Sequence, residues 1–203
     1  MTNDKHQNGR SSGVTIKSSK ELDLMRESGR IVAETKALLA ELIRPGLTTA
    51  ELDRIAENEI RKKGGVPSFK GYMGFPATIC SSFNDEIVHG IPSNRCMNEG
   101  DLISIDIGAI VGGFHSDTAF TVGVGVITKK AQCLIEATQE ALRLGIAQVK
   151  PGARIGDISS VIQEYSENLG YGVVRQYVGH GIGRSLHEDP QVPNYGSAGK
   201  GPI

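Results

Sequence analysis

Two aspartates interrupt apolar segments near the middle of the chain. Asp106 follows Leu102-Ile103-Ser104-Ile105, and Asp117 lies in the segment that returns after Gly112-Gly113. If the turn is at Gly112-Gly113, residue 108 lies opposite Asp117, and if the turn is one residue earlier, Asp106 does. Side chains alternate faces along a strand, so either register puts both carboxylates on one face. Their Cβ atoms are then about 5 Å apart if directly opposite, or about 7 to 8 Å on the diagonal.

Two half-buried carboxylates this close repel each other unless a cation lies between them or one keeps its proton. Three interpretations follow: a shared metal ion, an acid–base dyad, or two solvated strand residues. A single aspartate in a strand is usually solvated. Two aspartates on one face of an apolar hairpin favour the metal ion.

A histidine in a glycine-rich segment is the next candidate. His180 lies in Gly179-His180-Gly181-Ile182-Gly183, where the glycines leave room for a close approach. His187 is seven residues further on, so the helical His-Glu-x-x-His zinc motif is absent. The sequence also lacks a dinucleotide-binding glycine motif and a serine-hydrolase elbow. His89, taken alone, is more typical of a core histidine than of a metal ligand.

The elements that must position these residues begin with two helices. Ser18 and Glu21 have the spacing of a capping box, and apolar residues recur at helical intervals from Leu22 as far as Pro45-Gly46. Thr48 and Glu51 repeat the capping pattern before a second helix that stops at Gly64-Gly65. The region that follows is predicted to be β: short strands at 77–80 and 86–91, then a hairpin of 101–110 with 114–124.

The same helical plan returns 106 residues later, where Pro151-Gly152 matches Pro45-Gly46 and Gly170 matches Gly64. The apolar positions keep the same phase in both copies. This agreement indicates an internal duplication, in which each half is a helix pair followed by strands. Two unrelated helical hairpins that agree by chance are the alternative.

Composition limits the class of protein. The 203 residues suit one domain, and a net charge of −1 with scattered basic residues lacks the footprint of a nucleic-acid binder. No apolar stretch is long enough for a membrane span or a signal segment, which predicts a cytoplasmic protein. The three cysteines, Cys80, Cys96 and Cys133, have no Cys-x-x-Cys spacing and are expected to be buried thiols.

Several short motifs occur in an order and spacing that resemble the bacterial methionine aminopeptidases. The resemblance runs from about Val14 to Ile203. It implies an α+β pita-bread fold of the creatinase/aminopeptidase type, with two pseudo-symmetric halves around a curved antiparallel sheet and the second half incomplete. The motifs are Ile16-Lys17-Ser18-x-x-Glu21-Leu22-x-x-Met25-Arg26, Asn84-Asp85-Glu86-Ile87-Val88-His89-Gly90-Ile91-Pro92, Ile105-Asp106, Gly113-Phe114-His115-Ser116-Asp117-Thr118 and the segment around His180.

Residues 1–15 are polar with almost nothing apolar, which predicts a disordered tail. The resemblance implies one domain at 16–203. The first half covers about 16–127 and the truncated second half about 128–203.

The resemblance also implies the roles of individual residues. Asp106, Asp117 and His180 are expected metal ligands, with Asp117 bridging two ions. His89 and His187 are expected catalytic residues that face the substrate, His89 near its free amine and His187 near the scissile carbonyl. The expected methionine pocket contains Tyr72, Phe75 and Cys80.

The expected cofactors are two divalent ions of Co, Mn, Fe or Zn per subunit. Two such ions share a hydroxide and polarise the peptide carbonyl. The expected partner is the N-terminus of a nascent polypeptide with methionine first, at the ribosome, without direct contact to nucleic acid or membrane.

The chain departs from the family pattern at its C-terminus. The family needs two further glutamates, and the duplication places the counterpart of the 101–124 hairpin at about 207–230, beyond Ile203. Three protein ligands can hold one ion together with waters, but two ions need more donors than three. Weak or absent hydrolysis is therefore expected. The alternative of another class is a non-catalytic pita-bread module that binds polypeptide N-termini or a partner protein.

Overall fold

The structure is a computed structural model that describes residues 13–203. The polar tail predicted at 1–15 therefore lies mostly outside the described residues. At its described end, the Thr15 hydroxyl donates to Glu188, 3.4 Å away.

The first two helices start at the predicted caps. Helix α1 spans Ser19–Leu42 and helix α2 spans Thr49–Lys62. In each, the N-cap hydroxyl accepts from the backbone of the third helical residue, whose glutamate accepts from the backbone of the cap in return. These paired bonds satisfy N–H groups that the helix itself leaves free, which explains why both starts could be read from sequence.

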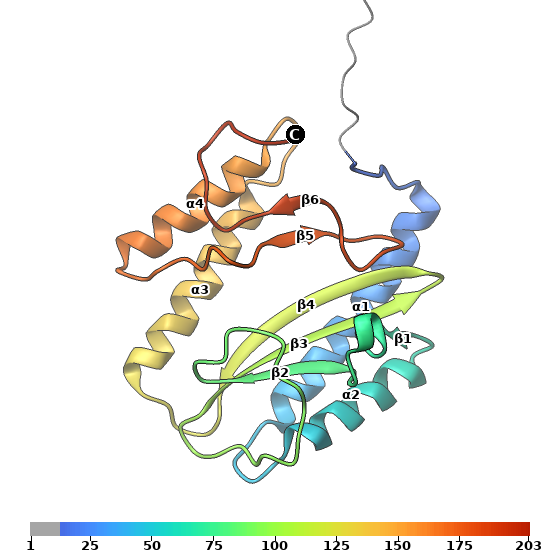
Figure 1. Cartoon of the computed structure of the whole chain (residues 1–203), viewed down its shortest axis with the longest axis vertical. Helices are drawn as coiled ribbons and strands as arrows, with labels where there is room; N and C mark the ends of the chain where they lie inside the picture. Colours follow the sequence, from blue (N-terminus) through green and yellow to red (C-terminus); the bar gives the residue numbers. More distant parts are fainter. Residues whose placement is uncertain (1–12) are drawn as a thin grey trace, which may run out of the picture.

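A four-stranded antiparallel sheet lies against these helices (Figure 1). Its long hairpin is β3, Leu102–Val111, and β4, Phe114–Gly123. The turn between them is Gly112-Gly113, and both glycines have positive φ, as a tight two-residue hairpin turn requires. The other edge of β3 pairs with β2, Ile79–Phe83, and with the short β1, Val66–Pro67.

The main core lies between the sheet and the two helices. Ile103, Ile105 and Ile107 of β3 are completely buried on the helix side, and the residues between them face the other way. Each fully buried aliphatic side chain contributes about 1.5 to 3 kcal/mol. The helices contribute Ile31, Val32, Leu39, Leu52, Ala56 and Ile60 to the same core. This packing leaves the opposite face of the sheet free for polar groups.

The prediction of a strand at 86–91 is wrong, and the strand predicted at 77–80 lies instead at Ile79–Phe83. Residues 86–91 form a loop in which His89 has a left-handed backbone with φ of 62°. Both edges of β3 are already paired, so this segment has no free edge of β3 to join. Gly90 instead packs closely on the backbone of Ser81.

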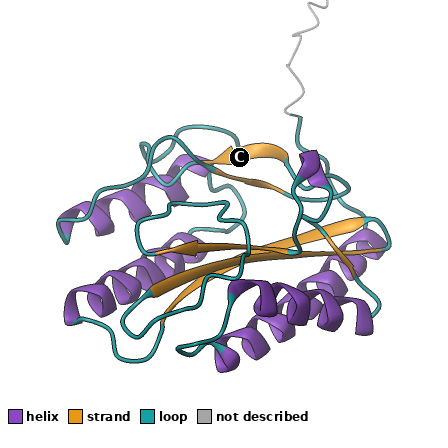
Figure 2. Cartoon of the chain, turned by 60° about the horizontal axis from the view of Figure 1, so that its bottom comes forward, coloured by secondary structure: helices purple, strands orange, loops and turns teal. Residues whose placement is uncertain are grey.

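The second half repeats the helix pair. Helix α3 spans Lys129–Ala147 and helix α4 spans Ile155–Asn168, so α4 begins and ends 106 residues after α2. The glycines at 46 and 152 have φ of 85° and 83°. The predicted duplication is therefore present in the backbone. A two-stranded sheet follows, of β5, Gly179–Gly181, and β6, Glu188–Val192. Figure 2 shows the two helix pairs as separate layers beside the strands.

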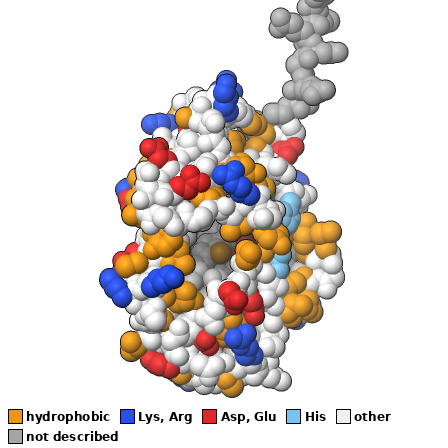
Figure 3. Space-filling view, turned by 60° about the vertical axis from the view of Figure 1, so that its left-hand side comes forward, with side chains coloured by type: hydrophobic (Ala, Val, Ile, Leu, Met, Phe, Trp, Pro, Cys, Tyr) orange, Lys and Arg blue, Asp and Glu red, His pale blue; other side chains and the backbone are white. Residues whose placement is uncertain are grey.

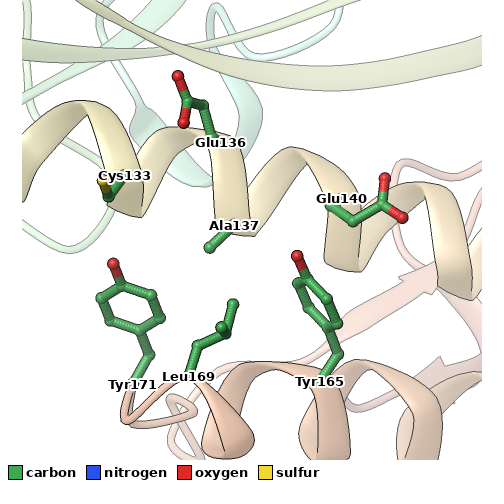
Figure 4. A pocket seen from close by; sticks show the side chains of 7 residues that line it. All are labelled: Cys133, Glu136, Ala137, Glu140, Tyr165, Leu169 and Tyr171. Carbon is green, nitrogen blue, oxygen red and sulfur yellow. The ribbon is translucent and has the colours of Figure 1, made fainter.

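The two helix pairs differ in how their helices are joined, because a lysine bridges the first pair and no lysine occupies the matching position of the second. Lys63 contacts Glu59 of α2 and Glu34 of α1. The residue 106 positions later is Leu169, and a cavity of about 430 Å³ lies there between α3 and α4 (Figure 4). It is lined by Cys133, Glu136, Ala137, Glu140, Tyr165, Leu169 and Tyr171. It holds no histidine, and Arg143 already pairs with Glu140.

Two further expectations concern the whole chain. Of the three thiols predicted to be buried, only Cys80 is. Cys133 is partly exposed and Cys96 is exposed, so the prediction is wrong for both. Cys96 lies in a loop whose neighbouring residues are mostly polar, and it pairs with Thr48 through one isolated bridge, which leaves its side chain outside the core. Within residues 13–203, no helix combines the length and apolar character that crossing a membrane requires.

Candidate metal centre and active site

The two aspartates lie on the same face of the β3–β4 hairpin. Asp117 is opposite Gly108 and Asp106 is opposite Ala119, so the first of the two predicted registers is the observed one. The carboxylates are therefore diagonal neighbours, on the face that the apolar core leaves free. Gly108 has no side chain to fill the space between them, and an added Cβ would meet Ser116, Ser68 and Phe69.

Asp106 resists ionisation in this setting. Burial, the negative charge of Asp117 and a hydrogen bond to the Asp117 side chain together raise the pKa of the Asp106 carboxyl to about 8. The backbone N–H of Ile107 opposes this shift. A carboxylate pair that stores repulsion is the arrangement that a bound cation relieves.

His180 of β5 meets this pair from the second half of the chain. Its Nε2 atom lies 3.4 Å from Oδ2 of Asp117. Its Nδ1 atom lies 2.9 Å from the backbone carbonyl of Gly181, and a carbonyl only accepts, so Nδ1 carries the proton. In the neutral ring, Nε2 then presents a lone pair to a carboxylate oxygen. Histidine ligands of metals are usually oriented by such a backbone bond.

The three side chains fit a divalent cation. They offer two carboxylates and one oriented imidazole nitrogen, a donor set that suits Mn, Fe, Co or Zn. Oδ2 of Asp117 and the Nε2 lone pair of His180 face each other, and beside them burial and the charge of Asp117 raise the pKa of Asp106. A cation between these groups would neutralise the repulsion. Within residues 13–203, however, no three His, Cys, Asp or Glu side chains are arranged as a formed metal cage. The donor types and their orientation therefore fit a cation, but the three side chains do not form a closed set of ligands.

A small apolar cluster lies beside the two aspartates. We call it the satellite cluster; it consists of Phe69, Cys80 and Leu186, which are buried, and Phe75, which is partly buried. Cys80 is directly opposite Asp106 in the sheet. Burial, followed by the charges of Asp106 and Asp117, raises the pKa of the Cys80 thiol to about 12, so the thiol stays neutral.

His187 stands between the satellite cluster and His180. It directly follows Leu186, and its ring centroid lies 4.1 Å from that of His180. Its Nδ1 atom lies 2.9 Å from the hydroxyl of Tyr72, which belongs to the short 3-10 helix η1, Tyr72–Gly74. Burial, followed by the nearby His180, lowers the pKa of His187, which favours the neutral ring.

His89 is exposed on the loop that follows β2. It makes an edge contact with Tyr177, with ring centroids 6.0 Å apart, and its charge lowers the pKa of His187. The expectation for His89 taken alone, a core histidine, is therefore wrong. Figure 3 shows a hollow in the surface with histidine side chains near one rim.

His115, for which the sequence indicated no role, lies near the site. His115 lies two residues before Asp117 on the same strand and therefore on the same face. Its Nδ1 atom is 3.1 Å from the Ser68 hydroxyl, and burial lowers its pKa. Strict alternation along β4 was the signal that could have found it.

The structure thus brings six of the predicted site residues into one linked set, with Phe75 next to it and His89 exposed and close enough to His187 to lower the pKa of that ring. The linked residues are Tyr72, Cys80, Asp106, Asp117, His180 and His187. Their individual roles remain predictions.

Comparison with known proteins identifies the class that this fold and donor set define. The sequence model of metallopeptidase family M24 matches residues 23–202, and the chain belongs to that family. Metal use is a property of the family.

Within family M24, the relatives of the chain are methionine aminopeptidases with the pita-bread fold. It is 53% identical over 190 residues to the enzyme of Clostridium acetobutylicum, covering 93% of this chain and 76% of the relative. It is 53% identical over 189 residues to methionine aminopeptidase 1 of Bacillus subtilis, with the same two coverages. The crystal structure of the Thermotoga maritima enzyme has a TM-score of 0.92 at 40% identity, over 94% of this chain and 77% of that one.

Proposed function

We propose that this protein removes the N-terminal methionine from polypeptides by hydrolysis of the first peptide bond. The observation that carries the proposal is the linked set of Asp106, Asp117 and His180 beside His187, in a chain with 53% identity to a methionine aminopeptidase over 93% of its length. The substrate is a nascent chain with methionine first. Such chains arise in the cytoplasm, where we place the protein.

Asp106, Asp117 and His180 are the residues that would hold divalent metal, with Asp117 positioned to serve two ions because it contacts both other ligands. When bound, such metal lowers the pKa of water and polarises a carbonyl. We propose Mn, Fe, Co or Zn and a count of two, as in the complete family site.

The chain's own residues then bind and orient the peptide. His187 lies beside His180 and is kept neutral by burial, so it can donate a hydrogen bond to the carbonyl oxygen as negative charge develops there. His89 is exposed, so a free amine can reach it.

The methionine side chain lies against Tyr72, Phe75 and Cys80. Phe75 and Cys80 belong to the satellite cluster, whose aromatic rings and neutral sulfur suit a polarizable thioether.

The test is release of free methionine from Met-Ala-Ser with Mn²⁺. We expect release that stops in EDTA and in Asp117→Asn. The matched control is Asp23→Asn, which alters an exposed aspartate paired with Arg26 and should release methionine at the parent rate. Peptide binding that persists unchanged in EDTA, without release, would instead favour a non-catalytic binding module.

A further inference from the structure

We propose that the hydroxyl of Tyr72 is a positioning group that holds His187 in a single neutral tautomer, with its proton on Nε2. The oxygen lies 2.9 Å from Nδ1 of His187. The identity of the substrate that His187 meets rests on the proposed function. The hydrogen bond itself does not.

The direction of this hydrogen bond follows from the chemistry of its two partners. A phenol can donate or accept, and a neutral imidazole has one nitrogen of each kind. An unprotonated imidazole nitrogen is a stronger base than a phenol oxygen, so the Tyr72 O–H donates and Nδ1 accepts. The only ring proton of His187 is then on Nε2, because the bond at one nitrogen sets the state of the other.

The satellite cluster brings the two partners together although they are 115 positions apart. Leu186 is 4% exposed and packs in the cluster directly before His187, while Phe69 of the same cluster is 6% exposed. The backbone N–H of Tyr72 donates to the carbonyl of Phe69, and that of Phe75 donates to the carbonyl of Tyr72. The backbone that carries each of the two side chains is therefore tied to one buried unit through its immediate neighbours.

Ring contacts restrict His187 further. Its centroid lies 5.5 Å from that of Tyr72, with 30° between the planes, and 4.1 Å from that of His180, with 40° between the planes. Rotation of the imidazole would break the bond to Tyr72 and disturb the contact with His180. The direction of the Nε2 proton is therefore set before a substrate arrives, which is the condition for effective stabilisation of a developing oxyanion.

The inference is tested on the metal-free chain by long-range ¹⁵N–¹H NMR of ¹⁵N-histidine-labelled protein near pH 8, above the ordinary histidine pKa of about 6.5. The His187 signals are assigned from their loss in His187→Gln. We expect a parent spectrum with Nε2 protonated and Nδ1 accepting, and a mixture of both tautomers in Tyr72→Phe. Tyr165→Phe removes a hydroxyl from the cavity between α3 and α4 and should retain the parent spectrum.

A parent spectrum with the proton on Nδ1, or a Tyr72→Phe spectrum identical to that of the parent, would overturn the inference. The parent spectrum alone is decisive if the variant fails to fold. In the hydrolysis assay, Tyr72→Phe should lower kcat about tenfold or more with little change in KM, the range typical for groups that orient a functional histidine.

The two proposals fail separately. The expected spectra without any methionine release would contradict the proposed function and leave the positioning role intact. Methionine release at equal rates in parent and Tyr72→Phe, with unchanged spectra, would contradict the positioning role alone.

Discussion

The Nε2 atom of His180 faces Oδ2 of Asp117 at 3.4 Å, while the other nitrogen of the ring donates to the backbone of Gly181. This relationship joins the two halves of the duplicated chain, because Asp117 belongs to the first hairpin and His180 to the second sheet. A strand of the second half thus brings an imidazole nitrogen to a carboxylate pair of the first half. Neither half alone contains the whole donor set.

Loss of one member of this donor set should weaken metal binding. We expect Asp117→Asn and His180→Asn each to reduce Mn²⁺ affinity more than about tenfold, since even the loss of a group that only orients a ligand costs 10- to 100-fold. The measurement is isothermal titration after dialysis against EDTA. Glu140→Gln removes an exposed carboxylate paired with Arg143 and should titrate like the parent. Equal affinity in all four proteins would exclude this site.

The raised pKa of Asp106 gives the metal-free protein a characteristic pH dependence. In the folded state this carboxyl keeps its proton up to about pH 8, but its ordinary pKa in an unfolded chain is 3.8. Between these values the folded state binds more protons than the unfolded state, so stability falls as pH rises. One such group contributes at most about 1.4 kcal/mol per pH unit.

Urea denaturation at several pH values between 4 and 8, in EDTA, measures this effect on the free energy of unfolding. Asp106→Asn cannot titrate and should show a flatter dependence over the same range. With Mn²⁺ present, the parent should show the opposite trend, because metal binding requires the deprotonated ligand and strengthens with pH. Parallel curves for parent and variant in EDTA would mean that Asp106 ionises normally.

Gly108 packs tightly against its neighbours and also lies opposite Asp117 in the candidate metal site. An added Cβ would come within 2.7 Å of the Ser116 carbonyl oxygen and 2.9 Å of the Phe69 ring. Because one of these atoms is backbone, Gly108→Ala must shift β4 or displace the satellite cluster. We expect a loss of about 1 to 3 kcal/mol in unfolding free energy, the usual cost of overpacking, together with weaker Mn²⁺ binding.

The control for this substitution is Gly172→Ala, at a glycine with open space around its added Cβ. Thermal and urea denaturation compare the two. A Gly108→Ala protein as stable as the parent, with parent metal affinity, would show that the hairpin accommodates the methyl group.

The sequence predicted the elements whose signals are local. The capping residues Ser18 and Thr48 marked both helix starts, and Gly112-Gly113 marked the hairpin turn. The register between Asp106 and Asp117 stayed open between two choices, because it depends on which turn residues take positive φ. The false strand at 86–91 arose because its apolar residues fit a strand, while the competition for the edges of β3 is invisible in one sequence.

The contact between Tyr72 and His187 could not be predicted from spacing, since it depends on a cluster assembled from three separate segments. The resemblance to a family named both residues, yet it did not pair them. Side-chain partners of this kind follow from packing of the whole domain rather than from local pattern.

Cysteine reactivity offers a direct probe of the environment around Asp106. The thiolate is the reactive form, and burial together with the charges of Asp106 and Asp117 raises the pKa of Cys80 to about 12. Cys96 is exposed. With iodoacetamide at pH 8, mass spectrometry should therefore find Cys96 alkylated first and Cys80 unmodified until urea unfolds the chain.

Asp106→Asn removes one negative charge but leaves the thiol buried, so Cys80 should remain protected in that variant. Alkylation of Cys80 at the rate of Cys96 in the folded parent would show that the face of the sheet beside the two aspartates is open to solvent, contrary to the packing of the satellite cluster.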